Sequence, residues 1–144
     1  MLTSQQCLKK FGTPGDVKTE GRFMSPWDIP VAINIAIPTL PNLLYCNNLI
    51  RAPLELAFRN VIARKLTGQI RTFDGCYKVR NKTGQKSLSL HCWGVAVDIN
   101  AAWNRYNAKP TMSPELVKCF TDAGFDWGGT WSKPDGMHFQ LKTV

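Results

Sequence analysis

The spacing of apolar residues changes along the N-terminal half of this chain, and each spacing predicts a different element. Over residues 31–37, Val and Ile alternate with Ala and Asn between two prolines, and this period of two predicts a strand. Over residues 53–66 the apolar positions recur at i, i+4, i+7 and i+8. This spacing predicts an amphipathic helix with Pro53 in its first turn and Gly68 just past its end.

Two other segments are mostly polar. Residues 1–28 are rich in Gly and Pro, so we expect a short helix over residues 4–10 followed by loop, with this extension packed onto the rest of the domain. Residues 69–73 are predicted to form a short strand, and residues 74–86 form a polar connection.

The C-terminal part has clearer signals. Residues 94–100 alternate between Val or Ile and smaller or polar residues, which predicts a strand with Asp98 on its second face. Ser113 is a good N-cap for a helix that runs to about residue 123, where Gly124 is a suitable stop. The last strand is predicted over residues 137–141. Helices mixed with separated short strands indicate an α+β fold.

Composition limits the class of protein. The chain has 144 residues, 44% of them hydrophobic, and a net charge of +8, which predicts one soluble globular domain over residues 1–144 and excludes a disordered tail. Five cysteines without a C-x-x-C pair predict reduced thiols. Residues 29–50 carry no charge, but prolines and asparagines interrupt them, so no transmembrane helix is expected. The N-terminus lacks a secretory signal, which predicts that the protein stays in the cytoplasm unless something releases it.

The only two histidines stand close to acidic residues. His91 precedes Asp98 by seven residues, and Asp98 interrupts an apolar strand, where a buried carboxylate is costly unless it is paired or bound to a cation. If the two strands are adjacent, Asp98 and His138 project from one sheet face, with His91 on the entering loop. Two imidazoles and a carboxylate, with a fourth position for water, make a catalytic zinc site. Asp135, three residues before His138, could reach that water as a general base.

Each of these residues also has an ordinary structural interpretation. Asp98 could pair with an arginine, both histidines could be hydrogen-bonded structural residues, and Asp135 could be a turn residue in the tract KPDG. Together these interpretations require four coincidences.

The motifs resemble a known family. The pattern S-x-H-x-x-G-x-A-x-D is present as Ser89, His91, Gly94, Ala96 and Asp98, and an acid-x-x-His pattern is present as Asp135 and His138. From about residue 69 onward the sequence resembles the zinc peptidases that include D-alanyl-D-alanine carboxypeptidases, dipeptidases and the L-alanyl-D-glutamate endopeptidases used by phages as endolysins. The tracts FDGCYKVR, SLSLHCWGVAVDINAAWN and GFDWGGTWSKPDGMHF, and more weakly the opening LTSQQCLKKFG, are similar to the small phage-encoded branch.

The resemblance implies a role for each motif residue. His91, Asp98 and His138 would bind one Zn²⁺ per chain, and Asp135 would be the catalytic base. An arginine upstream of the first histidine would bind substrate and stabilise the oxyanion. Arg80 is favoured for this role because it follows the GCY tract, and Arg71 is the second candidate. The remaining substrate-binding candidates are Ser89 and Trp131, although Trp127 and Trp131 are more typical of core or cleft wall than of catalysis.

These observations predict a small single α+β domain in which a short antiparallel sheet carries the zinc site and helices pack around it. The motif-bearing part covers about residues 69–144, and the function is a phage or prophage endolysin that cleaves the L-Ala/D-Glu bond of the peptidoglycan stem peptide. Such a monomer would need a holin-type partner to leave the host cytoplasm, and it would have no nucleic-acid partner and no stable membrane insertion.

Three alternatives remain open. A D-alanyl-D-alanine carboxypeptidase would use the same metal ligands with a differently closed cleft. A small basic nucleic-acid-binding protein would suit the pI of about 9.5 and the five tryptophans, but it leaves the His and Asp pattern unexplained. A non-catalytic wall-binding protein is opposed by the complete set of candidate ligands and base.

Overall fold

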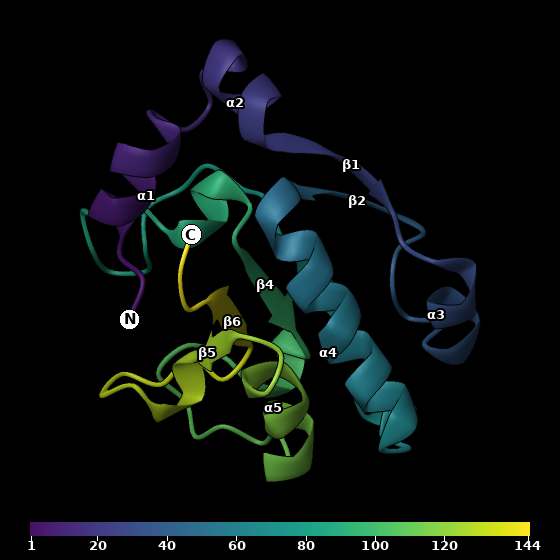
Figure 1. Ribbon diagram of the computed structural model, residues 1–144. Coiled ribbons are helices and arrows are strands. Elements are labelled where there is room, and N and C mark those ends of the chain that lie inside the picture. The colour runs from purple at the N-terminus through teal and green to yellow at the C-terminus, as the bar shows by residue number, and fades with distance from the viewer.

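Four short strands from the second half of the chain build the sheet that organises the protein. In the computed structural model, which describes residues 1–144, all neighbours in this sheet are antiparallel and the order is β3-β4-β6-β5 (Figure 1). The strands are β3 (Phe73–Gly75), β4 (Ala96–Ile99), β5 (Phe125–Trp127) and β6 (His138–Leu141). The central pair, β4 and β6, places Val97 opposite Phe139 and Asp98 opposite His138.

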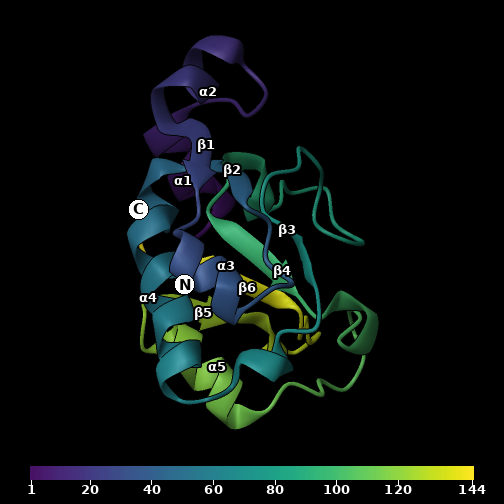
Figure 2. The same ribbon diagram turned by 90° about the vertical axis from the view of Figure 1, so that its right-hand side faces the viewer.

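A second, two-stranded antiparallel sheet pairs β1 (Met24–Asp28) with β2 (Leu43–Asn47). The helices are α1 (Ser4–Phe11), α2 (Val17–Phe23), α3 (Val31–Ala36), α4 (Arg51–Ala63) and α5 (Pro114–Thr121). Figure 2 shows α4 running alongside the larger sheet, with α5 near its lower end and α2 standing out at the top. The α+β class and the single small domain predicted from the sequence are confirmed.

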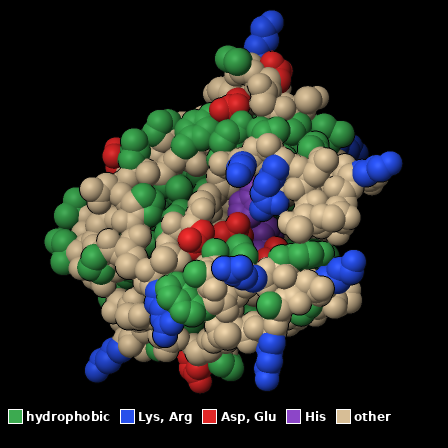
Figure 3. Space-filling view, turned by 180° about the vertical axis from the view of Figure 1, so that it is seen from behind, with side chains coloured by type: hydrophobic (Ala, Val, Ile, Leu, Met, Phe, Trp, Pro, Cys, Tyr) green, Lys and Arg blue, Asp and Glu red, His purple; other side chains and the backbone are tan.

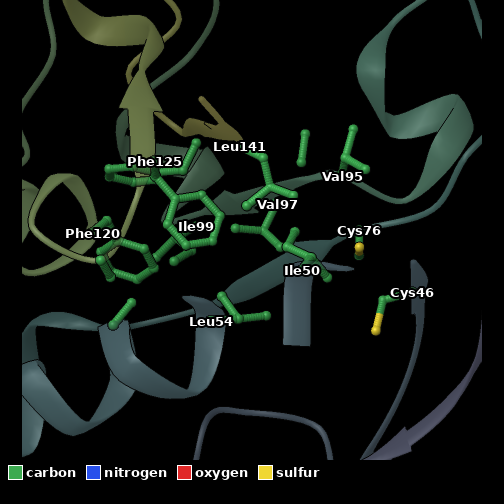
Figure 4. Packing of buried hydrophobic residues seen from close by; sticks show 14 of the residues in the cluster. Cys46, Ile50, Leu54, Cys76, Val95, Val97, Ile99, Phe120, Phe125 and Leu141 are labelled. Carbon is green, nitrogen blue, oxygen red and sulfur yellow. The ribbon is translucent and has the colours of Figure 1, made fainter. Parts of the chain in front are cut away.

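The core fills the space between one face of the larger sheet and helices α4 and α5. Val97 and Ile99 of β4 meet Leu54 of α4 and Phe120 of α5 there, and all four are completely buried (Figure 4). Burial of an aliphatic or aromatic side chain of this size contributes about 1.5–3 kcal/mol relative to exposure. Because strand side chains alternate, the opposite face of β4 and β6 is left free for Asp98 and His138.

The N-terminal segment is fixed by polar contacts. A capping box starts α1, in which the N–H of Gln6 donates to Thr3 Oγ1 (3.3 Å) and the N–H of Thr3 donates to Gln6 Oε1 (2.8 Å). The Tyr45 and Tyr77 hydroxyls both donate to Glu20 of α2, the second at 2.9 Å. These contacts tie α2 to β2 and to the segment that follows β3.

The strand predicted over residues 31–37 is wrong, because residues 31–36 form helix α3. Ile33 and Ile37 are completely buried, whereas Val31 and Ile35 are 73% and 74% exposed. The buried positions therefore repeat every four residues, although the alternation of apolar and small residues also fits a period of two. Asn34 stabilises this turn, since its side-chain amide donates to the carbonyl of Pro41 at 3.0 Å.

The boundaries near residue 70 also differ from the prediction. Residues 69–73 do not form a strand; the main-chain N–H groups of Arg71 and Thr72 both donate to Asn100 Oδ1 (2.8 and 3.1 Å), and strand pairing begins only at Phe73. The predicted helix over residues 53–66 is present but ends at Ala63, before the position expected from Gly68, and Lys65 follows in the left-handed conformation with a φ of 58°.

Other predictions are confirmed. The helix at residues 4–10, the strands at 94–100 and 137–141 and the helix capped by Ser113 are all present, and the Ser113 hydroxyl accepts from the N–H of Leu116 (3.1 Å). The pattern missed α2, β1, β2 and β5. All five cysteines are unpaired and buried. None of the helices has both the length and the apolar character that crossing a bilayer requires.

Candidate metal centre and active site

Three candidate ligands meet on the open face of the larger sheet. Asp98 and His138 are register partners on β4 and β6, and His91 comes from a 3₁₀ helix, Leu90–Trp93, that leads into β4. His91 Nε2 lies 3.2 Å from Asp98 Oδ1 and 3.2 Å from His138 Nδ1, and His138 Nδ1 lies 3.4 Å from Asp98 Oδ1. The prediction that the sheet would bring these side chains together is confirmed by this geometry, and their role as ligands stays a prediction.

Local sequence explains how His91 reaches the cluster. Ser89 caps the 3₁₀ helix, with its hydroxyl accepting from the N–H of His91 at 3.3 Å. Gly94 ends the helix in the left-handed region at a φ of 63°, where a Cβ atom would lie 2.6 Å from the end of Met24 and 2.8 Å from the main-chain nitrogen of Asn47. The glycine of the H-x-x-G motif is therefore required both by backbone conformation and by close packing.

The tautomer of the neutral His91 ring is set by the contact of its Nδ1 atom. His91 Nδ1 lies 2.7 Å from the carbonyl oxygen of Cys76. A carbonyl oxygen can only accept, so Nδ1 carries the proton of the neutral ring and Nε2 presents a lone pair to the cluster. This arrangement is the usual outer contact of a metal-binding histidine.

The electrostatics of Asp98 also suit a cation. Burial by itself raises the pKa of Asp98, but the hydrogen bonds and positive charge that His138 and His91 supply when they are protonated outweigh it and lower this pKa well below its usual range, so the side chain is a carboxylate. Its Oδ1 atom is buried and has no partner with hydrogen-bond geometry. A buried anionic oxygen without a partner is costly, and a bound cation would remove that cost.

The donor set fits zinc. Metal–ligand distances of about 2.0–2.1 Å in a tetrahedron place ligand atoms about 3.3 Å apart. The three donor atoms of His91, Asp98 and His138 lie 3.2–3.4 Å from one another. Two imidazole nitrogens and one carboxylate oxygen are typical ligands of a catalytic zinc with an open fourth position.

Asp135 lies beside this cluster on the turn before β6. Its N–H donates to the carbonyl of Gly128 (2.9 Å), and its own carbonyl accepts from the N–H of His138 (3.1 Å). Burial raises the pKa of Asp135, the charge of Asp98 raises it further, and the histidines and Arg80 lower it in part. Asp135 Oδ1 is buried without a hydrogen-bond partner, so this oxygen is free to accept a proton from a bound molecule.

The cluster opens into a cavity of about 270 Å³. In Figure 3 histidine side chains (purple) are visible at the bottom of a hollow, with basic and acidic side chains around it. The side chains that line the cavity combine His138 and Asp135 with aromatic, hydroxyl and cationic groups, including Arg80, Lys82, Ser89, Tyr106, Trp131, Lys133 and Gln140. Trp131 forms part of the wall, with its ring centroid 5.4 Å from that of His138.

This geometry lies in a stretch that matches a known family. Residues 83–141 match the D-alanyl-D-alanine carboxypeptidase family. The matched stretch is less than half of the chain, and it contains all three candidate metal ligands together with Asp135. The match supports a zinc-dependent peptidase that acts on peptidoglycan. No curated protein and no solved structure matches the chain.

The stretch that matches the carboxypeptidase family begins after Arg71 and Arg80, so the match does not choose between these two candidates for the substrate-binding arginine. Their positions in the structure do distinguish them. Arg80 Nη2 lies 4.0 Å from Asp98 Oδ2, and Arg80 lines the cavity. Arg71 instead stacks over the Trp103 ring at 4.9 Å and lines a different groove. The structure therefore brings Arg80 to the site and leaves Arg71 outside it. The sequence also allowed a purely structural pair between Asp98 and an arginine. In the structure Arg80 approaches only the Oδ2 atom of Asp98, because the Oδ1 atom faces the histidines.

Several residues of the site have no sequence prediction. Lys82, Lys133 and Tyr106 line the cavity, and Gln140 contacts His138 from the same strand face. The position of Gln140 could have been predicted from the sequence, because in a strand the residue two positions after His138 points to the same side of the sheet. The sequence does not single out Lys82 and Lys133, because lysines occur all along this basic chain.

Proposed function

We propose that this protein is a zinc peptidase of phage or prophage origin that cleaves the L-Ala/D-Glu bond of the peptidoglycan stem peptide. The observation that carries the proposal is the convergence of His91 Nε2, Asp98 Oδ1 and His138 Nδ1 within 3.2–3.4 Å, next to Asp135 at the base of an open cavity. The match of residues 83–141 to the D-alanyl-D-alanine carboxypeptidase family supports the same class of reaction.

The chain's own residues supply the proton transfer and the charge stabilisation. A zinc ion held by the three ligands would act as a Lewis acid and lower the pKa of water at its open position. The Asp135 carboxylate accepts a proton from the attacking water and passes it to the leaving amine. Arg80 donates hydrogen bonds to the scissile carbonyl oxygen as negative charge develops on it.

The charge of the cavity favours an anionic peptide. Arg80, Lys82 and Lys133 line it, whereas Asp135 is its one acidic lining residue. Stem peptides carry free carboxylates close to the bonds that such enzymes cut, and guanidinium and ammonium groups bind carboxylates through charge-assisted hydrogen bonds. The hollow in Figure 3 is open to solvent, as cleavage inside a cross-linked polymer requires.

The second candidate is a D-alanyl-D-alanine carboxypeptidase, which the description of the matching family favours. Such an enzyme must hold a terminal carboxylate with a fixed cation at one end of the cleft. Arg80, Lys82 or Lys133 could provide this cation, so the products decide between the two activities.

The decisive experiment is digestion of purified peptidoglycan followed by mass spectrometry of the released peptides. We expect new D-Glu amino termini, L-Ala left on the glycan, falling turbidity and loss of all three effects with a chelator. Asp135→Asn is the matched inactive control, because it keeps the ligands. Release of free D-Ala alone, without a fall in turbidity, would establish the carboxypeptidase, and no released product at all would refute the peptidase.

The biological role requires its own test. We propose that the protein acts as a monomer, accumulates in the host cytoplasm and reaches the wall only after a holin-type partner permeabilises the membrane. Bacteria expressing the chain should therefore lyse when such a permeabilising protein is co-expressed and not without it. Lysis by the chain alone would contradict this dependence.

A further inference from the structure

Gln140 connects the metal cluster to the start of the chain. Its side chain is buried on the same strand face as His138, with His138 Nε2 3.1 Å from Gln140 Oε1. The Gln140 Nε2 group donates to the carbonyl oxygen of Leu2 at 3.2 Å, across 138 residues of sequence. His138, Gln140 and Leu2 are each at most 5% exposed.

The Leu2 carbonyl determines which way the amide faces. An amide side chain can present either its oxygen or its NH₂ group, but a main-chain carbonyl oxygen can only accept. The NH₂ group of Gln140 must therefore face Leu2, and Oε1 must face His138. An oxygen in that place requires the proton of neutral His138 on Nε2, which leaves the Nδ1 lone pair facing Asp98 Oδ1 and His91 Nε2.

The same N-terminal segment contacts the element that carries the other histidine. The Ser4 hydroxyl donates to the carbonyl of Leu88 (2.8 Å), and Trp93 Nε1 donates to the carbonyl of Gly12 (2.8 Å). Helix α1 is thus fastened at both ends to the segment that contains His91. The two histidines share one support, which is built from the first twelve residues of the described chain.

We propose that Gln140 is a positioning residue for the metal site: held by the Leu2 carbonyl, it fixes the ring orientation and the tautomer of His138 in which Nδ1 can bind a metal ion. The proposal rests on the zinc peptidase function proposed above. Outer contacts of this kind typically change metal affinity by about 10- to 100-fold when they are removed.

Two substitutions separate this role from simple packing. Gln140→Met keeps the length of the side chain and removes both polar groups, so we expect weaker zinc binding by about 10- to 100-fold. Gln140→Glu keeps an acceptor for the His138 Nε2–H but cannot donate to Leu2, so it should restore zinc affinity toward wild type while lowering the melting temperature of the zinc-free protein. Gln85→Met is the matched control, because Gln85 lines the same cavity and its side-chain hydrogen bond is to Ser87 instead of a histidine.

The readouts are zinc competition against a chromophoric chelator and ¹⁵N–¹H correlation of the imidazole groups. In wild type, with and without zinc, the His138 proton should reside on Nε2. A proton on Nδ1 in the zinc-free protein, or wild-type zinc affinity in Gln140→Met, would overturn the positioning role and leave the proposed function intact. Wild-type protein that binds no zinc would overturn both. A loss in Gln140→Met that Gln140→Glu fails to restore would show that an acceptor for the His138 Nε2–H does not set the zinc affinity, and would also overturn the proposal.

Discussion

Gly128→Ala tests whether the main chain around Gly128 positions Asp135, the proposed catalytic base. The Gly128 carbonyl accepts from the N–H of Asp135, and a Cβ atom at Gly128 would lie 2.6 Å from the Asp135 carbonyl oxygen, 3.1 Å from its Cβ and 3.3 Å from Trp131. Carbon atoms do not approach oxygen this closely without cost, so Asp135 would have to move by roughly half an ångström or more. No metal ligand is among these contacts.

The magnitudes follow from this displacement. A misplacement of about 1 Å costs about 10²-fold in rate, so we expect Gly128→Ala to lose about 10- to 100-fold in peptide release. Overpacking of this kind costs about 1–3 kcal/mol, which for a chain of this size lowers the melting temperature by roughly 3–10 °C. Zinc content should stay at one ion per chain. The assays are peptide release by mass spectrometry, elemental zinc analysis and thermal unfolding.

Gly68→Ala is the matched control. A Cβ atom at Gly68 meets nothing within 4 Å, and its backbone is outside the left-handed region. We expect unchanged activity and a neutral or slightly positive change in stability of up to about 1 kcal/mol. If Gly128→Ala kept wild-type rate and melting temperature, the reasoning would be refuted. Loss of zinc together with rate would place the damage at His138 instead of Asp135.

Four further outcomes follow from the site and its surroundings. Asp135→Asn should keep zinc and fold while losing about 10²- to 10⁴-fold in rate, and loss of zinc would make Asp135 a ligand. Arg80→Ala should lower kcat/KM with zinc retained, whereas Arg71→Ala should leave it unchanged; the reverse pattern would transfer the role to Arg71. Removing zinc with a chelator should lower the melting temperature, and added zinc at about 100 times its Kd should restore about 2.7 kcal/mol of stability. Burial, and then the hydrogen bond to Glu20 and its charge, raise the pKa of Tyr77 to about 12. The stability from its neutral phenol is therefore complete below a pH of about 10 and is lost as the pH rises from there through the folded-state pKa of about 12. In a phenolate titration Glu20→Gln should lower this pKa, and an unchanged titration would contradict the role of Glu20.

The parts of the fold that the sequence predicted well are those in which one physical constraint dominates. Residues 94–100 and 137–141 alternate because one face packs in the core and the other forms the site, and Ser113 caps α5 through a local contact. The prediction of a strand over residues 31–37 is wrong because Val or Ile at every second position fits the period of a strand, while Ile33 and Ile37, four residues apart, also fit one face of a helix. Only the tertiary burial of Ile33 and Ile37 selects the helix.

The candidate site divides in the same way. His91, His138 and Asp98 could be found because the chain has only two histidines and because an acid within an apolar strand is conspicuous. Gly128 and Gln140 act through contacts with Asp135 and Leu2 that depend on how distant segments fold together. A glycine and a glutamine at these positions do not by themselves predict those contacts.

The pairing of β4 with β6 makes correct folding and assembly of the metal cluster a single event. A slip of one residue between these strands would send each side chain of the slipped strand to the opposite face. Asp98 or His138 would then be driven among Leu54 and Phe120, and Val97 or Phe139 would be turned toward water. The apolar core therefore penalises every register that would scatter the ligands. A chain that has packed its core has already brought Asp98 and His138 together, so a metal ion held by these candidate ligands would bind after folding without any rearrangement of the strands.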